Sequence, residues 1–400
     1  MPVTSYQRAI EGSTATIPTE IRQHVSTNNS TDWNSYFEQN LYTISGTAVY
    51  GVDYRIICWQ SPYDNGTTYV TNPIQMQDGT LGFKHTTFYR TGSYKNTIYI
   101  ETIHNPNIVY SQNKTLTIHF NATNSFETSG SVTVEIKEID RQSDPNSRIN
   151  GISTRGFVGT GNDVMVSGFI TSGTTNKTLL MRGEGPSLSA LGVANTITDP
   201  YLELYNSSSQ LVESNNDWQS GPNANEITQL GQAPGNPREA AILDTFSPGV
   251  RTLMLKNNGT GSVGLLEVWD ISNDPGSKLT AISTRARVGV YDKTLTVGFS
   301  IISGAKRVII TGKGPELANY GIADTAGGLL ALTLYDSTGH VVEYNESWKS
   351  AWNTDVIAAN PQHPTMDNEP AIVETLPAGE YTAVLTATTE GVGMIEVYEY

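Results

Sequence analysis

The sequence is poor in the residues on which disulfide bonding and most side-chain chemistry depend. Its 400 residues include a single cysteine, Cys58, and only 16% of them are charged. One cysteine excludes an intrachain disulfide, and the strand-like setting of Cys58 predicts a buried, unreactive thiol. No apolar run approaches the roughly eighteen residues that a membrane-spanning helix needs. Disulfide-stapled scaffolds and helical membrane proteins are therefore excluded.

Positive charge is also scarce. The chain has 24 lysines and arginines against 39 aspartates and glutamates, which gives a formal net charge of -15 and a pI near 4.8. Phosphate backbones are bound by clustered lysine and arginine, so this balance argues against a nucleic-acid partner. It also disfavours direct attachment to anionic lipid.

Histidine is distributed in a way that disfavours nucleophilic and zinc chemistry. The six histidines are His24, His85, His104, His119, His340 and His363. None lies between residues 152 and 271, and no two occur at a zinc-ligand spacing. A Ser-His-Asp or Cys-His arrangement is therefore excluded from that segment. The sequence does not exclude a pair of glycosidase carboxylates, because the two residues of such a pair can be far apart in the sequence and close together in the fold.

What the chain does contain is a duplication. A block of about 120 residues begins at Ile152-Ser-Thr-Arg and returns at Ile282-Ser-Thr-Arg. Trp218 returns as Trp348 at a spacing of 130, and one deletion shifts other matches to 129. A repeat this long exceeds the period of solenoid proteins, so each copy is predicted to be a domain with its own core.

Short runs of alternating apolar and polar residues, separated by turn residues, fill both copies and the first third of the chain. This pattern is typical of antiparallel sheets. We predict an all-β protein of three tandem antiparallel β-sandwich domains in an elongated arrangement. The predicted segments are a first sandwich at 1–140, a linker at 141–151, repeat 1 at 152–271, a linker at 272–281 and repeat 2 at 282–400.

The clearest strand patterns can be placed within these segments. In the first domain they are Tyr36–Val49, Thr97–Ile103, Thr115–Phe120 and Ser131–Ile136. In repeat 1 they are Val164–Ile170, Lys177–Arg182, Tyr201–Tyr205, Thr252–Lys256 and Gly264–Asp270, and repeat 2 carries their counterparts.

The first domain resembles Calx-β domains. The resemblance is carried by Glu11–Ile17, by the Gly-Thr-Ala and Gly-x-Asp-Tyr corner within Tyr42–Tyr54, and by Asn113–Phe120. In calcium-binding members an early glutamate and the corner aspartate hold the ion, which implies Glu11 and Asp53 as calcium candidates. The later acidic cluster of that family is replaced here by His104 and neutral residues. The alternative is that Asp53 braces the corner turn through backbone amides.

The two repeats are similar to the Ile-Ser-Thr-Arg-Gly repeats of secreted bacterial proteins. The stretch from Asp199 to Trp218, followed by Phe246–Gly249, is also similar to bacterial pre-peptidase C-terminal domains. These resemblances imply an extracellular appendage with no catalytic role.

Oxygen-bearing side chains in the first repeat make a second calcium candidate from Glu203, Asn215 and Asp217, since calcium prefers oxygen ligands. A third calcium candidate is formed by the aspartates at the two linkers, Asp140, Asp144, Asp270 and Asp274. No other cofactor is expected. Trp218, Trp348 and Trp352 lie near turns, where they could stack on sugar rings. The alternative for the equivalent pair, Trp218 and Trp348, is that they anchor the long loop of each repeat over its core.

These observations predict a non-catalytic structural or adhesive protein of a bacterial cell surface, matrix or fibre. Its expected partners are other copies, joined through strand edges, or surface proteins and glycans. Residues 6–17 are a candidate donor strand. The alternative is a carbohydrate-binding accessory protein. The first eight residues lack the apolar core of a signal peptide, so a leader has been removed or export follows another route.

Overall fold

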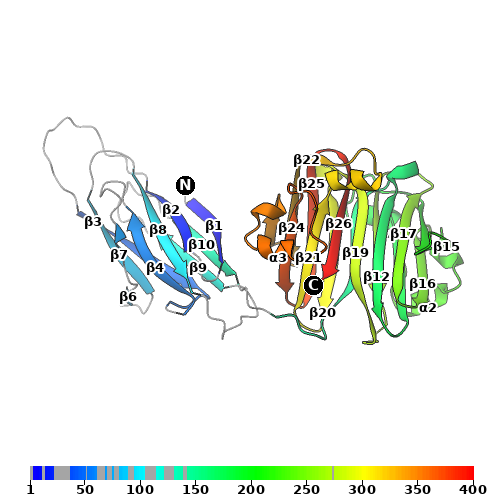
Figure 1. Ribbon diagram of the computed structural model, residues 1–400, viewed down its shortest axis with the longest axis horizontal. Coiled ribbons are helices and arrows are strands. Elements are labelled where there is room, and N and C mark those ends of the chain that lie inside the picture. Colours follow the sequence, from blue (N-terminus) through cyan, green and yellow to red (C-terminus); the bar gives the residue numbers. More distant parts are fainter. Residues whose placement is uncertain are drawn as a thin grey trace. The chain divides into compact units, whose positions relative to one another are not determined.

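The computed structural model shows a chain built almost wholly of antiparallel β-sheet, which confirms the predicted fold class (Figure 1). It describes residues 3–10, 14–21, 37–50, 52–60, 68–69, 74–75, 81–88, 94–103, 114–120, 130–137, 142–272 and 274–400. The chain divides into two compact units, Met1–Arg141 and Gln142–Tyr400. No described helix is long and apolar enough to cross a bilayer.

Unit 1 consists of two sheets. Six strands pair in the order β1-β10-β9-β3-β7-β6 and four in the order β2-β8-β4-β5. The strands are β1 (Val3–Ile10), β2 (Thr14–Ile21), β3 (Phe37–Gly46), β4 (Tyr54–Gln60), β5 (Thr68–Tyr69), β6 (Ile74–Gln75), β7 (Leu81–Phe88), β8 (Tyr94–Thr102), β9 (Lys114–Phe120) and β10 (Gly130–Lys137). All pairs are antiparallel except β1, which runs parallel to β10.

The core of unit 1 forms where the two sheets contribute alternate apolar residues. Tyr54 and Ile100 come from the four-stranded sheet, and Leu116, Ile118 and Val134 come from the six-stranded sheet. The burial of alternate residues confirms the predicted pattern in β9 and in residues 131–134 of β10.

Unit 2 contains sixteen strands, half of them from each repeat. Repeat 1 supplies β11 (Arg148–Phe157), β12 (Met165–Gly173), β13 (Lys177–Glu184), β14 (Pro200–Asn206), β15 (Leu211–Asn215), β16 (Ala240–Phe246), β17 (Gly249–Asn257) and β18 (Val263–Asp270). Repeat 2 supplies β19 (Ser277–Val288), β20 (Leu295–Ile302), β21 (Lys306–Lys313), β22 (Gly327–Asp336), β23 (Val341–Asn345), β24 (Ala371–Leu376), β25 (Gly379–Thr389) and β26 (Gly391–Glu399).

The sixteen strands form two continuous layers of eight. One layer runs β15-β14-β17-β12-β19-β26-β21-β24, and the other runs β23-β22-β25-β20-β11-β18-β13-β16. Each layer therefore takes four strands from each repeat. The layers pack face to face, since a side chain added at Gly183 in β13 would contact Leu255 in β17 and Leu202 in β14. One apolar core runs through both repeats.

The joint between the repeats differs from the two linked domains that the sequence analysis expects. β12 of repeat 1 pairs with β19 of repeat 2, and β11 of repeat 1 pairs with β20 of repeat 2. Residues 277–281 of the segment expected as the linker 272–281 already belong to β19. Each repeat is a sandwich of two four-stranded sheets. In an isolated repeat the inner edge strand of each sheet would have unpaired backbone groups, and pairing with the other repeat provides hydrogen-bond partners for both edges.

Short helical segments complete the unit. They are η1 (Gly161–Asp163), α1 (Pro186–Ala190), η2 (Trp218–Ser220), α2 (Ala224–Gln229), η3 (Tyr291–Lys293), η4 (Pro315–Tyr320), η5 (Trp348–Ser350) and α3 (Thr354–Ala358). Figure 1 shows α3 beside β24 at one end of the unit and α2 beside β16 at the other.

The first and last strands of unit 2 meet at one corner. The Ile149 amide at the start of β11 donates to the Glu399 carboxylate at the end of β26, at 3.0 Å. Nearby, the Tyr400 amide donates to the Arg307 carbonyl at 2.9 Å, and the Asp144 amide donates to the Ala305 carbonyl at 2.7 Å. One end of the unit is thereby bonded to Ala305, in the turn before β21, and the other to Arg307, near the start of β21.

Candidate functional site

Asp53, a predicted calcium ligand, braces the corner of unit 1. Its side chain is 3% exposed, and its carboxylate accepts the Val49 amide at 2.6 Å. Its own backbone amide donates to the Val49 carbonyl at 2.8 Å. These bonds are those of a turn-stabilising aspartate, the alternative that the sequence leaves open. Glu11, its predicted partner, lies outside the described residues.

The second predicted calcium set is not brought together. In the pairing of β14 with β15, Leu202 lies opposite Asn215, whereas Glu203 lies opposite Ser214. Paired residues share a face and neighbours alternate, so Glu203 and Asn215 point to opposite sides of the sheet. One ion between them would need both on one side.

Each of these side chains also has a partner of its own. Glu203 forms an ion pair with Lys256 and accepts a hydrogen bond from Tyr205 at 2.6 Å. The Asn215 side chain accepts the Ala241 amide at 3.0 Å and donates to the Asp217 carbonyl at 3.2 Å, which ties β15 to the loop and to β16. The Asp217 carboxylate accepts a hydrogen bond from the side-chain Nδ2 of Asn216 at 3.3 Å.

The linker aspartates serve as turn and core residues. The carboxylates of Asp144 and Asp274 each accept a backbone amide two residues ahead, from Asn146 and Gly276, at 2.8 Å. The Asp270 side chain is fully buried and pairs with Lys177 at 2.9 Å. Among the described residues, no group of three or more His, Cys, Asp or Glu side chains is placed to hold a metal ion.

The two equivalent tryptophans lie under the covering loops. Trp218 and Trp348 are 8% and 4% exposed. Each packs with apolar residues of the neighbouring strands and of α2 or α3 in a small second core on the outer face of one layer. The expectation that they anchor the long loops is confirmed, and burial removes both from contact with a sugar ring.

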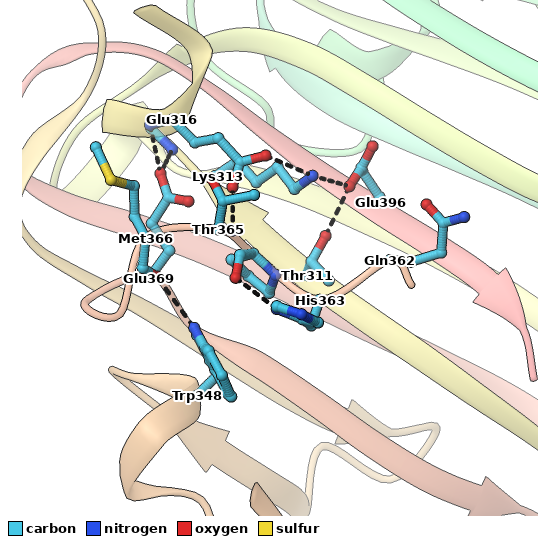
Figure 2. Close-up of polar contacts among 12 residues, drawn as sticks. Thr311, Lys313, Glu316, Trp348, Gln362, His363, Thr365, Met366, Glu369 and Glu396 are labelled. Atoms are coloured by element: carbon cyan, nitrogen blue, oxygen red, sulfur yellow. Dashed lines mark hydrogen bonds and ion pairs between the residues drawn. The ribbon is translucent and has the colours of Figure 1, made fainter. Parts of the chain in front are cut away.

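A buried carboxylate organises the same region in both repeats. Glu369, just before β24, accepts the Gly314 amide at 2.8 Å and the Glu316 amide at 2.9 Å, where η4 begins (Figure 2). In repeat 1, Glu239 accepts the amides of Gly185 and Ser187 at 3.0 and 2.9 Å. The backbone amides of the glycine corners are thus occupied by the chain's own carboxylates.

The two carboxylates differ in their second oxygen. In repeat 1 the Asn236 amide donates to Glu239 Oε2 at 3.0 Å, and the Ser187 hydroxyl adds a bond to Oε1 at 2.6 Å. Glu369 Oε2 is buried with no hydrogen-bond partner, and Glu316 replaces the serine. Burial raises the pKa of Glu369 to about 7, the two amides oppose this shift, and the negative charge of Glu316 adds to it.

Ion pairs next to this carboxylate are rearranged between the repeats. Lys313 lies between Glu316 and Glu396, at 3.1 and 3.0 Å, and Thr311 donates to Glu396 at 2.9 Å (Figure 2). In repeat 1, position 313 corresponds to Glu184.

In repeat 1 the positive charge belongs to Arg182, two positions before Glu184. Arg182 forms ion pairs with Glu267 at 2.5 Å and with Glu184 at 3.4 Å. Each repeat thus keeps one cation against its buried glutamates, which is the arrangement of a structural network.

Two surface hollows remain as candidates for ligand binding. The first, of about 310 Å³, lies at the outer end of repeat 2 between β23, the η5 loop and β24. The second, of about 480 Å³, lies over the joint between the repeats, with Trp269 and Tyr335 in its lining. Sequence reasoning missed both, although Trp352 in the first hollow was visible as an aromatic residue near a turn.

Comparison with known proteins does not assign this chain to a family. No protein-family model matches the chain, and no curated protein matches it. Among solved structures, CBD12 from CALX1.2 is 10% identical, with a TM-score of 0.21, over 74% of this chain and 78% of that chain. The C-terminal domain of the antigen I/II-family protein AspA of Streptococcus pyogenes is 8% identical, with a TM-score of 0.22, over 74% and 91%. The collagen adhesin CNA of S. aureus is 10% identical, with a TM-score of 0.17, over 74% and 84%.

Proposed function

We propose that this chain is a non-catalytic extracellular protein of a bacterial surface, matrix or fibre that acts by contact, as an adhesive or structural component. The observation that carries the proposal is that strands at the outer edges of unit 2 carry exposed apolar side chains.

The outer edges of unit 2 are candidates for contact. β15 ends one layer and β23 ends the other, and the opposite ends of these layers are β24 and β16. Leu211 and Val212 of β15 are 53% and 48% exposed, and Tyr344 of β23 is 48% exposed. An edge strand with exposed apolar side chains is a template for pairing with another chain, including a second copy.

A flow-chamber assay tests the adhesive role. Beads coated with the full chain should be retained under shear on panels of bacterial surface proteins and matrix polysaccharides, whereas beads coated with an unrelated acidic β-protein should not. Turnover of any glycoside, ester or peptide substrate by the purified chain would overturn the non-catalytic proposal.

Self-association has its own test. Sedimentation and negative-stain imaging at rising concentration should show assemblies that Val212→Lys and Val341→Lys abolish, because a lysine on an edge strand blocks strand addition. Deleting residues 1–17 tests strand donation, since β1 pairs with β10 within unit 1 and would have to leave it to pair elsewhere. Assemblies unaffected by all three changes would exclude strand pairing as their basis.

Carbohydrate binding is a second candidate, favoured by one observation. Trp352 is 42% exposed and lines the hollow of repeat 2. An exposed indole beside carboxylates is a surface on which a sugar ring can stack. Glycan binding lost in Trp352→Ala would support it. Trp218→Ala and Trp348→Ala are unsuitable tests, because both rings are buried.

A further inference from the structure

The hollow of about 480 Å³ lies on the outer face of one layer, where the two repeats join. The strands pair there in the order β18, β11, β20, β25 and β22, of which the first two belong to repeat 1 and the others to repeat 2. Ser153 in β11 lines the hollow, and its neighbours Ile152 and Thr154 are buried in the core. Paired residues share a face, so the lining can be followed in rows that cross the strands.

One of these rows occurs twice in unit 2. At the hollow, Ser153 pairs with Glu267 on one side and with Gly298 on the other. Gly298 pairs with Thr382, and Thr382 pairs with Tyr335. The outer face of the other layer has a row with the same five residue types in the same pairing, made of Glu396, Ser283, Gly168, Thr252 and Tyr205. The two outer faces are therefore built on one framework.

The next row differs between the two faces. At the hollow it consists of Trp269, Gly151, Ser300 and Glu380. On the other face it consists of Tyr398, Ala281, Ile170 and Val250. The two middle residues at the hollow are each smaller than their counterparts, which lowers the floor. An exposed carboxylate also replaces a valine that is 49% exposed. The shared framework thus carries a polar hollow on one face and an apolar surface on the other.

The aromatic residue at the β18 side of the hollow has an unused donor. The Trp269 ring lies against Gly151, where an added side chain would come within 2.0 Å of it. Its indole Nε1 is buried and has no hydrogen-bond partner among the described residues. On the other face, the Tyr398 hydroxyl donates to Glu396 at 2.9 Å. A buried donor without a partner calls for an explanation, and an acceptor on a bound molecule provides one.

The aromatic residue at the β22 side has also lost a partner. On the other face, the Tyr205 hydroxyl donates to Glu203 at 2.6 Å. The residue that corresponds to Glu203 beside Tyr335 is Thr333, which has no carboxylate. The hydrogen bond that occupies the tyrosine on one face is thus removed on the face with the hollow.

The rest of the lining is rich in hydroxyl groups and has no positive charge. Its hydroxyl-bearing residues besides the tyrosines are Ser153, Ser300, Ser337 and Thr382, and its carboxylates are Asp336 and Glu380. The described residues that line it include no lysine, arginine or histidine. The Asp336 carboxylate holds the turn after β22 by accepting the amides of Thr338 and His340. The exposed Glu380 is therefore the carboxylate that a ligand would meet.

These features favour a sugar over an anion or a peptide. Carboxylates repel an anionic ligand, and no cation in the lining compensates for them. The strands under the floor are paired on both sides, so no strand edge is present there for a peptide to extend. Aromatic rings beside hydroxyl and carboxylate groups match the apolar faces and the hydroxyl groups of a sugar.

We propose that this hollow binds a neutral glycan chain. A sugar ring would pack against Trp269, and its hydroxyl groups would bond to Ser300 and Glu380. Trp269 and Ser153 come from repeat 1, whereas Ser300, Glu380 and Tyr335 come from repeat 2, so neither repeat contains the whole site. This inference rests on the proposed contact function and names its ligand class, at a place other than the Trp352 hollow.

Binding of the full chain to a glycan array tests the proposal. Oligomers of glucose, xylose, mannose or N-acetylglucosamine should include at least one ligand, whereas oligomers of galacturonic acid and of glucosamine should not bind. In titration calorimetry with the strongest neutral oligomer, the affinity should be insensitive to salt. Trp269→Ala should weaken it about tenfold. Ser300→Ile and Glu380→Val, which introduce the residues of the other face, should each weaken it severalfold.

Matched variants separate binding from folding. Val250→Glu makes the reverse exchange on the other face and should leave the affinity unchanged. Glu380 is exposed, so Glu380→Val should unfold at the temperature of the unchanged chain. Trp269 packs on Gly151, and a Trp269→Ala variant that unfolds early is replaced by Tyr335→Phe, which removes only a hydroxyl group. Trp352→Ala should bind the oligomer as the unchanged chain does.

Every other pattern of results counts against the site. Binding lost in Trp352→Ala but kept in the Trp269, Ser300 and Glu380 variants would place the sugar in the other hollow. Binding of acidic or cationic oligomers alone would overturn the neutral ligand. Absence of binding to every oligomer would overturn the site itself, while retention of coated beads on surface proteins under flow would still uphold the contact function.

Discussion

The hydroxyl oxygens of Thr154 and Thr284 meet 2.9 Å apart at the middle of unit 2, and both side chains are fully buried. The two residues are 130 positions apart, so each is the repeat counterpart of the other. Contact between a residue and its own counterpart occurs at a two-fold axis. The repeats are therefore related as the halves of a two-fold dimer, within one chain.

Valine at position 154 should destabilise unit 2 by about 1–2 kcal/mol, because it leaves the buried Thr284 hydroxyl with only the longer contact to Ser167, at 3.4 Å. The double variant Thr154→Val, Thr284→Val should cost less than the sum of the single changes. Chemical denaturation measures all three. Thr178→Val, in an exposed threonine pair of similar length, is the control and should be nearly neutral.

Removing the charge of Lys177 should be among the most damaging single changes. Lys177 and Asp270 are both fully buried and lie 2.9 Å apart, so Lys177→Met leaves an uncompensated carboxylate. We expect a loss of about 3–5 kcal/mol in the free energy of unfolding. Lys306→Met should cost less, since its partner Glu399 keeps Lys278 at 2.7 Å. Equal costs would contradict this account.

Close packing across the joint can be tested at Gly298. A methyl group there would lie 2.8 Å from the Ser153 hydroxyl, which belongs to the other repeat. Gly298→Ala should destabilise the chain by about 1–3 kcal/mol, and adding Ser153→Ala should recover part of that loss. If the changes in unfolding free energy of the two single variants add up to that of the double variant, residues 153 and 298 are not in steric contact across the joint.

Stability should decrease from pH 5 to pH 8 through two buried carboxyls. Burial raises the pKa of Glu184 to about 7, as it does for Glu369, from an ordinary 4.5. A carboxyl whose pKa is higher in the folded chain stabilises fully below about pH 4.5, and this contribution is lost as the pH rises through 7. Each contributes at most about 3 kcal/mol. Glu184→Gln should flatten the pH profile of the unfolding free energy.

Glu203 should behave in the opposite sense. Burial alone would raise its pKa, but hydrogen bonds from Lys256 and Tyr205 outweigh burial and lower it. Its contribution is present above about pH 4.5 and is lost as the pH falls through the lowered pKa. Glu203→Gln should therefore reduce stability at neutral pH and reduce acid sensitivity. A profile changed in the same direction by both variants would contradict these assignments.

The strands that build each sandwich could be predicted, because residues such as Leu202 and Leu255 alternate strictly with polar neighbours. Two of the four strands that join the sandwiches, β11 and β19, were missed. Both contain the sequence Ile-Ser-Thr-Arg, in which a buried threonine bonds to its counterpart in the other repeat. A polar residue at a core position interrupts the alternation of apolar and polar residues, so the strand is not recognised from the sequence alone.

The candidate site shows a similar limit. Trp352 and Tyr344 were each visible in the sequence, but the hollow depends on β23 and β24 ending opposite layers beside one another. Likewise, Glu203 and Asn215 are close in sequence and chemically suited to calcium, yet a difference of one position in strand register separates them. Spacing along the chain does not fix which face a residue occupies.

The edge-to-edge joint bears on how such a chain can grow or shrink. Cutting away either repeat would leave two apolar strand edges of the survivor open to water and prone to aggregate. A single additional repeat would find no unpaired inner edge strand with which to pair. Genes that encode this architecture are thus expected to gain and lose repeats in pairs. A chain with an odd number of repeats would need an additional segment to cover the unpaired edge strands.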